Sequence, residues 1–248
     1  MVNKFLDVFK LTISLAGLIS TFYAVIELTY FLSVPRTVKL SAKDPWLESS
    51  WALLVDMCLL TLFIIQHSTM ASESFKHFLY SYKIRETQRS LYVISTAAFI
   101  WILIKYWQVA PILALWQLDF SYKPALWLYI GIHFMAWIII YVANICTDVT
   151  ELLGIKQVYY SLVNLPDPNR RKSYQLRKLT THMRHPSFLG FLLIFWFFPV
   201  MTLDRLLLAA ILTSYMYIAW NTDGEDYEYQ KSMYQRKYHE LQRLNSLN

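Results

Sequence analysis

The stretch PALWLYIGIHFMAWIIIYVANICT, residues 124–147, contains no Asp, Glu, Lys or Arg, and His133 is its only histidine. A helix needs roughly 20 mostly apolar residues to cross the hydrocarbon core of a bilayer. In lipid its backbone N–H and C=O groups must pair internally, which a helix achieves. This stretch is long enough, and it therefore predicts a transmembrane helix.

Together with five further apolar runs, this helix predicts a bundle of six spans. The runs cover residues 8–31, 51–66, 90–107, 124–147, 186–203 and 206–222. Only Asp204 and Arg205 separate the last two runs, which predicts a tight antiparallel hairpin. Residues 112–118 are too few to span, so we expect a re-entrant or interfacial segment there. The expected fold class is all-α, a multi-pass transmembrane helical bundle that forms one integral membrane domain over residues 1–248.

The composition agrees with a membrane protein. Hydrophobic residues make up 56% of the chain and charged residues 16%, whereas a soluble domain has about 25% charged residues. The formal charge of +6 is spread between the predicted spans. It therefore indicates orientation and affinity for membrane lipids, and we expect no direct binding of nucleic acid.

The basic residues favour one side of the membrane. Of the 23 Lys and Arg residues, 17 lie at the N-terminal end of the chain (Lys4 and Lys10), in the loops 67–89 and 148–185, or after the last run. This asymmetry predicts that both termini face the cytosol or nucleoplasm. In the tail 223–248, Tyr227, Tyr234, Tyr238 and Leu241 recur at helical spacing, which predicts a helix on the membrane surface.

Two groups of polar residues flank the predicted hairpin. Arg184 and His185 precede Pro186 at the mouth of a helix, where unpaired N–H groups favour a carboxylate or phosphate. An anchor at the lipid headgroups explains the same pair. Gly190 permits the close approach of a ligand or of another helix.

The second group is Asp223-Gly224-Glu225-Asp226, directly after the hairpin. The hairpin should return these acids to the neighbourhood of Arg184 and His185. They form either a clamp for a cofactor or a structural ion network.

A third group ends the second span and opens the third. Gln66, His67 and Ser68 lie at one end of the span 51–66, and Arg89 precedes the span 90–107 on the same predicted side. His67 suits ligand binding or acid–base chemistry, because imidazole titrates near neutral pH. A histidine satisfied at the membrane interface is the alternative.

The remaining special residues lie inside the predicted spans. Glu27, Asp56 and His133 are costly in lipid and should face the bundle interior. Cys58 and Cys146 lie in apolar runs, so we expect buried thiols rather than a disulfide. No metal-binding motif is present in the sequence.

Several short motifs, in order and at matching spacing from about residue 55 to the end, resemble the nurim family. The motifs are Gln-His-Ser-Thr-Met-Ala-Ser (66–72), Gln-Arg-Ser-Leu-Tyr-Val (88–93), Leu-Leu-Gly-Ile-Lys-Gln-Val (152–158), Arg-His-Pro-Ser-Phe-Leu-Gly (184–190) and Phe-Trp-Phe-Phe-Pro-Val-Met-Thr (195–202). The resemblance implies a multi-pass protein of the inner nuclear membrane, or also of the endoplasmic reticulum, with possible association with the nuclear lamina. The wider family includes methanethiol S-methyltransferases and resembles the isoprenylcysteine carboxyl methyltransferases.

That wider likeness implies S-adenosylmethionine as a cofactor, no metal, and methyl transfer to an amphiphilic thiol or a lipidated carboxylate. It implies the following roles. The cofactor-binding residues would be Arg184, His185, Gly190, Asp223 and Asp226; the catalytic residues would be His67 and Glu225; the substrate-binding residues would be Gln66, Ser68 and Arg89.

The sequence departs from these enzymes at three positions. Phe188 stands where the enzymes usually have Tyr, Gly224 stands where they have the second acid of a Glu-Glu pair, and Gln88 stands where they tend to have Glu. Two other functions therefore stay open: a non-catalytic scaffold or lipid-binding protein of the nuclear envelope, and a protein resembling the sterol reductases.

Overall fold

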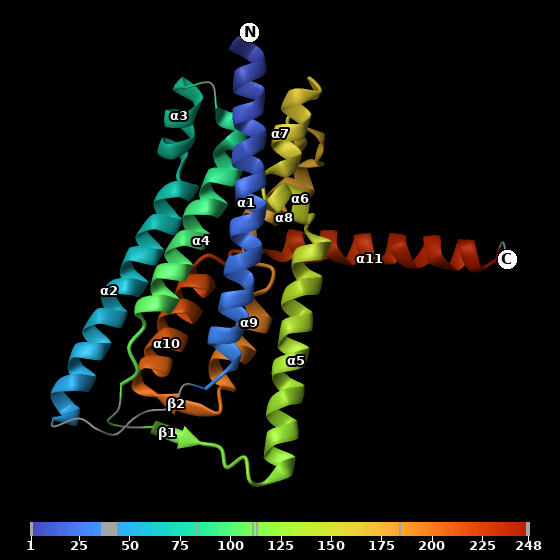
Figure 1. The fold of residues 1–248 in the computed structure, drawn as a ribbon. Coiled ribbons are helices and arrows are strands. Elements are labelled where there is room, and N and C mark those ends of the chain that lie inside the picture. Colours follow the sequence, from blue (N-terminus) through green and yellow to red (C-terminus); the bar gives the residue numbers. More distant parts are fainter. Residues whose placement is uncertain are drawn as a thin grey trace.

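The computed structural model describes residues 2–35, 44–82, 84–110, 112, 114–183 and 185–246. The prediction of an all-α membrane bundle is confirmed (Figure 1). Within the described ranges, four helices are long and apolar enough to cross a membrane: α1 (Val2–Ser33), α2 (Pro45–Ala71), α4 (Gln88–Tyr106) and α5 (Lys123–Cys146).

Local sequence signals fix the start of α2. The Asp44 side chain accepts hydrogen bonds from the backbone N–H groups of Trp46 and Leu47. Pro45 takes the first helical position, where the N–H group that it lacks would have had no partner within the helix.

The last two predicted spans form shorter helices. α9 covers Phe188–Trp196, β2 covers Val200–Thr202 and α10 covers Leu203–Ile218. At about 1.5 Å per residue, both helices fall short of a hydrocarbon core of roughly 30 Å. Six membrane crossings therefore stay a prediction. The expected turn at Asp204 and Arg205 is wrong: both are buried in the first turn of α10, and residues 197–202 connect the helices.

The segment expected to be re-entrant or interfacial contains an exposed strand, β1 (Ala114–Gln117). β1 pairs antiparallel with β2, with Gln117 opposite Val200. In Figure 1 the two strands lie at one end of the bundle. The pairing ties the α4–α5 connection to the α9–α10 connection.

The shorter helices gather at the opposite end of the bundle (Figure 1). They are α3 (Glu73–Ser81), η1 (Arg85–Thr87), α6 (Val149–Leu152), α7 (Ile155–Leu162), η2 (Pro168–Arg171) and α8 (Tyr174–His182). We call the end at which these shorter helices gather the helical end. The last helix, α11 (Gly224–Asn245), projects away from the bundle.

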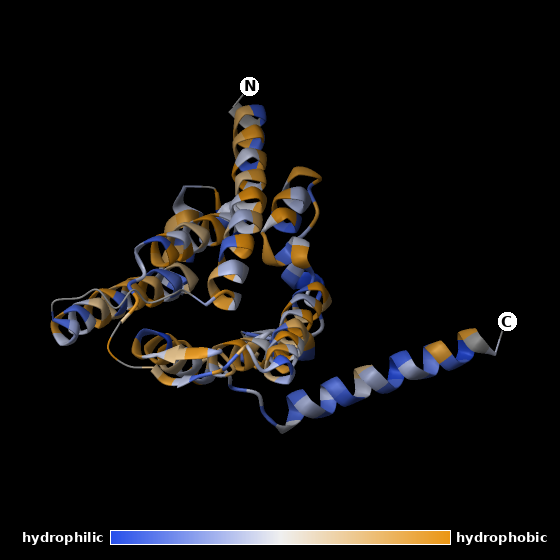
Figure 2. Cartoon of the chain, turned by 60° about the horizontal axis from the view of Figure 1, so that its bottom comes forward, coloured by the Kyte–Doolittle hydropathy of each residue, from blue (hydrophilic) through white to orange (hydrophobic). Residues whose placement is uncertain are grey.

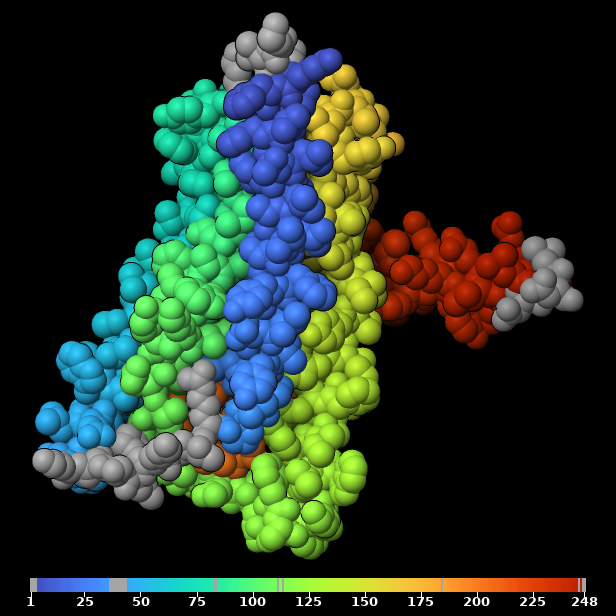
Figure 3. All heavy atoms as spheres, in the orientation of Figure 1, coloured from blue at the N-terminus to red at the C-terminus, as the bar shows by residue number. Residues whose placement is uncertain are grey.

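The core runs along the inside of the bundle. α1 lies between α4 and α7 (Figure 3), and Phe31, Leu60 and Ile194 are fully buried. Large apolar side chains such as Phe22 and Trp127 point outward. Hydrophobic residues run along the bundle helices, whereas α11 is largely hydrophilic (Figure 2). Lipid would cover this outer apolar surface.

Ionisable residues of the spans make contacts at the end of the bundle that carries β1 and β2, which we call the strand end. Asp56 and His133 are buried, as expected, and Glu27 is half-buried. Asp56 accepts a hydrogen bond from the backbone N–H of Gln108 at 2.9 Å, and His133 Nε2 lies 3.3 Å from the carbonyl oxygen of Phe197. The expectation of buried thiols is wrong, because Cys58 and Cys146 are both exposed on the outer surface.

Candidate functional site

Four rings from four parts of the chain meet toward the helical end. His67 comes from α2, Tyr92 from α4, Tyr215 from α10, and His185 precedes α9. The His67 and His185 rings are stacked, with centroids 6.1 Å apart and planes at 22°. The Tyr215 ring lies 6.1 Å from His67 and 6.3 Å from His185. We call these four residues the ring cluster.

Helical spacing positions His67 within this cluster. Tyr92 and Thr96 are four residues apart and therefore share a face of α4. The Tyr92 hydroxyl lies 2.6 Å from His67 Nε2, and Thr96 Oγ1 lies 3.5 Å from Nδ1. Phe63, one turn earlier on α2, stacks on the imidazole at 5.5 Å. Each imidazole nitrogen thus lies beside a hydroxyl group, and the Tyr92 hydroxyl is also 3.1 Å from Nδ1.

The two residues beside His67 also belong to this site. Ser68 Oγ lies 3.0 Å from the Tyr215 hydroxyl. Gln66 Nε2 donates to Ser95 Oγ at 2.9 Å, while Gln66 Oε1 is buried and has no hydrogen-bond partner among the described residues. A buried acceptor without a partner is costly and is uncommon in folded proteins. It is therefore available to a ligand that donates a hydrogen bond.

Arg89 has a different environment from the one expected of a substrate-binding residue. Its Nε donates to the carbonyl oxygen of Leu152 at 2.7 Å, and its guanidinium lies 5.0 Å from the centre of the Tyr92 ring. Arg89 thus fastens α6 to α4 and supports Tyr92 from behind.

The acids after α10 contact α8. Lys178 lies 2.7 Å from Asp223 and 2.5 Å from Glu225. Its hydrogen bond lowers the pKa of Asp223 to about 2, and the two carboxylates raise the pKa of Lys178 above its usual range. His182 Nδ1 lies 2.5 Å from Asp226 Oδ2. The expected meeting of acids and bases therefore occurs, but with Lys178 and His182 as the basic partners.

A capping box further fixes two of these acids. The Asp223 side chain accepts from the backbone N–H of Asp226, and the Asp226 side chain accepts from that of Asp223. Ligand atoms of His182, Asp223 and Asp226 lie within 4.8 Å of one another. The cap and the ion pairs account for this grouping as a structural junction between α8 and α11.

The last two predicted site residues are Gly190, which the structure describes, and Arg184, which it does not. Gly190 packs against α5: a β-carbon there would lie 2.5 Å from Ile140 Cγ1 and 2.7 Å from the Ala136 carbonyl oxygen. The close approach to Gly190 in the structure is that of a helix, and the role expected for Gly190 in cofactor binding stays a prediction. Arg184 lies outside the described residues.

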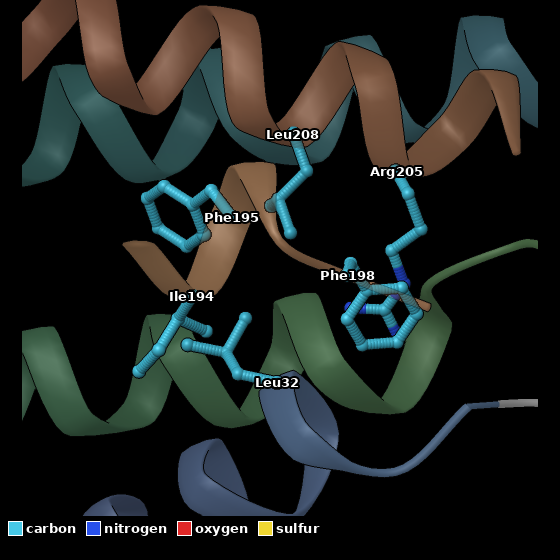
Figure 4. Close-up of a pocket in the computed structure, with 6 residues that line it drawn as sticks. All are labelled: Leu32, Ile194, Phe195, Phe198, Arg205 and Leu208. Carbon is cyan, nitrogen blue, oxygen red and sulfur yellow. The ribbon is translucent and has the colours of Figure 1, made fainter. Parts of the chain in front are cut away.

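A small cavity lies deeper in the bundle (Figure 4). It is lined by Leu32, Ile194, Phe195, Phe198, Arg205 and Leu208. Its volume of about 10 Å³ leaves room for about one water molecule. The Arg205 guanidinium lies 4.3 Å from the Phe31 ring centre and 4.5 Å from that of Phe198. This cavity is too small to hold an organic cofactor.

The sequence analysis predicted no site role for Tyr92, Tyr215, Lys178 or His182. Tyr92 lies within the motif 88–93, and Tyr215 follows Thr213 and Ser214, so polar residues in an apolar run were a usable signal. Lys178 and His182 lie four residues apart on α8, which places them on one helix face.

The fold and the ring cluster define a class, that of multi-pass helical membrane proteins with a polar site at one end of the bundle. Over 249 aligned residues the chain is 38% identical to the nurim homolog of Drosophila pseudoobscura pseudoobscura, covering 96% of this chain and 98% of the relative. It is 35% identical to mouse nurim and 34% identical to human nurim, covering 93% of this chain and 94% of each relative. The chain belongs to the nurim family. No family model and no solved structure matches it.

Proposed function

We propose that this protein resides in the inner nuclear membrane and uses the ring cluster for methyl transfer to a thiol or a lipidated carboxylate, with S-adenosylmethionine as donor. The observation that carries the proposal is the meeting of His67 and His185, from distant parts of the chain, with the hydroxyls of Tyr92 and Tyr215. Paired imidazoles and hydroxyls at the end of an apolar bundle suit a ligand that is polar at one end.

One buried atom near the ring cluster would suit such a donor. Gln66 Oε1 is a buried acceptor without a partner among the described residues, and it suits an ammonium or a sugar hydroxyl. S-adenosylmethionine, when bound, supplies a methyl group on a positively charged sulfonium sulfur. Because attack by an anion cancels charge, exclusion of water by the surrounding apolar helices would favour the reaction.

His67 is the residue that would prepare a thiol. It accepts the thiol proton at Nδ1, while the Tyr92 hydroxyl at Nε2 and the stacked Phe63 ring keep the imidazole oriented. The resulting thiolate would form the new bond to the methyl carbon as the bond between that carbon and the sulfonium sulfur of the donor breaks, leaving the electron pair on the donor sulfur. Tyr215, held by Ser68, limits the space beside His185. Correct placement of the two reactants would contribute most of the rate acceleration.

The acids have an indirect part in this proposal. Asp223 and Glu225 are paired with Lys178, and Asp226 is paired with His182. These contacts favour a positioning role, in which the junction of α8 and α11 fixes the segment that leads to His185. The catalytic role expected for Glu225 stays a prediction.

Calorimetric titration of the purified full-length protein in detergent tests the proposal. We expect saturable binding of S-adenosylmethionine that His185→Ala abolishes and that His239→Ala, on the far part of α11, leaves unchanged. The far-ultraviolet circular dichroism of both variants should match that of the parent. Binding of NADPH instead would favour the reductase-like function.

A non-catalytic scaffold is the second candidate. The observation in its favour is that Gly224 stands where the enzymes have an acid, and that Asp223 and Asp226 are held in the capping box. Neither S-adenosylmethionine nor NADPH would then bind to the folded protein.

The proposed location is tested by antibody staining and by extraction. Antibodies against a tag on α11 should stain the nuclear rim only after the inner nuclear membrane is opened. Resistance to detergent extraction would support association with the lamina.

A further inference from the structure

α11 leaves the bundle after its first turns. Lys178 and His182 of α8 hold its start, whereas every described side chain from Tyr234 to Leu244 is exposed. Figures 1 and 2 show the helix projecting away from the bundle in two views. Most helical stability in proteins comes from packing rather than from propensity. The outer part of α11 therefore lacks its main source of stability within this chain.

The exposed apolar residues of α11 share one face. Tyr227, Tyr234, Tyr238 and Leu241 fall within about 60° of one another at 100° per residue, and each is 58–73% exposed. Arg236 lies on the opposite side of the helix. We call the four residues the tyrosine face.

The placement of α11 matches a membrane surface. The helix runs crosswise to α5, near the level at which α5 and α10 end (Figure 1). α5 ends there at Cys146 and α10 at Ile218, whereas α1 and α4 continue beyond this level toward the helical end (Figure 1). A helix in the plane of the interface can bury its apolar side while its polar side stays in water.

The charge of the outer part of α11 is positive. Residues 229–246 carry four basic side chains and one acid, Glu240, for a formal charge of +3. Lys231 and Lys237 flank the tyrosine face on either side. We infer that α11 is a membrane-surface helix that inserts the tyrosine face among the headgroups of anionic phospholipids. A second copy of the chain fits less well, because two such helices would bring like charges together.

Spin labelling of the full-length protein tests this inference. A nitroxide is placed on a cysteine at position 234, 238, 236 or 243, with Cys58 and Cys146 changed to Ser. The protein is reconstituted in phosphatidylcholine vesicles with and without phosphatidylserine. We expect labels at 234 and 238 to favour collisions with oxygen, and labels at 236 and 243 to favour collisions with a water-soluble nickel complex. Phosphatidylserine should increase the difference in collision preference between the labels at 234 and 238 and those at 236 and 243.

Charge variants separate lipid charge from apolar burial. Lys231→Gln and Lys237→Gln should each weaken docking in phosphatidylserine vesicles roughly fivefold, whereas Lys76→Gln on α3 should leave it unchanged. Equal water access at all four positions would overturn the inference, and so would docking that ignores both phosphatidylserine and the lysines. Spin–spin broadening that vanishes on dilution with unlabelled protein would assign the face to a second copy instead. None of these outcomes depends on the ring cluster.

Discussion

Ser90 and Gly154 touch where α4 meets the turn between α6 and α7. Ser90 Oγ donates to the carbonyl oxygen of Leu153 at 3.2 Å. A β-carbon on Gly154 would lie 2.5 Å from that Oγ and 2.6 Å from the Ser90 backbone nitrogen, and φ of Gly154 is +83°. Both the space and the backbone conformation exclude a side chain. Two of the family motifs, 88–93 and 152–158, thus dock on each other.

Gly154→Ala is expected to lower the stability of the folded protein by about 2–4 kcal/mol, since it adds both a clash and backbone strain. The measurement is the thermal unfolding midpoint in detergent. Gly131→Ala is the matched control, because no atom lies within 4 Å of its β-carbon position on α5. It should be neutral or slightly stabilising. Equal losses in the two variants would contradict the docking.

The ion pair of Asp223 and Lys178 predicts a dependence on pH. The Lys178 hydrogen bond lowers the pKa of Asp223 from 3.8 to about 2. A carboxylate with a depressed pKa stabilises the folded state above pH 3.8, and this contribution is lost as the pH falls through about 2. The carboxyl carbon shift of Asp223 should titrate at this low pH. Lys178→Gln should raise the midpoint toward 3.8, whereas Lys172→Gln should not move it.

At this scale, part of the site was predictable. His67 and His185 were identified because an imidazole at the end of an apolar run is conspicuous, and the structure brings them together. The partners of Asp223 and Asp226 were not identified. Local spacing places Lys178 and His182 on one helix face, but it does not show which distant acids that face meets.

Among the elements, the segment after α4 depends on one residue of α10. Asp204 accepts hydrogen bonds from Trp107 Nε1 and from the backbone N–H of Ala110, both at 3.0 Å. Asp204→Ala removes the acceptor of both bonds. The expected loss of stability is about 2–5 kcal/mol, because a buried donor deprived of its acceptor costs about 1–3 kcal/mol.

Asp204→Asn should cost less than Asp204→Ala, since it retains one carbonyl oxygen. Asp119→Asn, in the exposed connection before α5, is the control and should have little effect. The thermal midpoints should therefore fall in the order Asp119→Asn, Asp204→Asn, Asp204→Ala. An Asp204→Ala variant as stable as the parent would show that the Trp107–Ala110 segment is held by other contacts.

Hydropathy predicted the four long helices because length and lack of charge decide such elements. Hydropathy placed the α9–α10 turn wrongly, because we expected the charged residues Asp204 and Arg205 to be exposed. Asp204 and Arg205 are buried and bonded, so the connection lies earlier, at 197–202. Residues 112–118 had no recognisable partner in the sequence, since the pairing of β1 with β2 joins segments more than 80 residues apart.

Across the whole molecule, the two ends differ in chemistry. At the strand end, Asp56 and Asp204 accept hydrogen bonds from the backbone N–H groups of Gln108 and Ala110, and His133 contacts the carbonyl oxygen of Phe197. The part of the molecule toward the helical end holds the ring cluster, the α8–α11 junction and most of the basic residues. The arrangement agrees with the sidedness that the basic residues predict, and it places the proposed site near the surface on which α11 would lie.

The pairing of β1 with β2 makes the number of membrane crossings testable. Because β2 pairs with β1, the turn between α9 and α10 must lie on the same side of the membrane as the α4–α5 connection. Cysteines at Gln117 and Val200, which face each other in the register, should form an intramolecular disulfide on oxidation when Cys58 and Cys146 are changed to Ser. Cysteines at Leu115 and Val200, out of register, should not.

Labelling with a membrane-impermeant maleimide then gives the side. A cysteine at Arg170 should react from the cytosolic face of sealed microsomes, whereas one at Asp119 should react only after the vesicles are permeabilised. Together with the disulfide, this result would require α9 to cross the membrane, and the ion pairs of Lys178 with Asp223 and Glu225 would then require α10 to return the chain, despite the length of both helices. Reaction of both positions from the cytosolic face would refute the six-span arrangement, because Asp119 and Arg170 are separated by α5 alone among the long apolar helices.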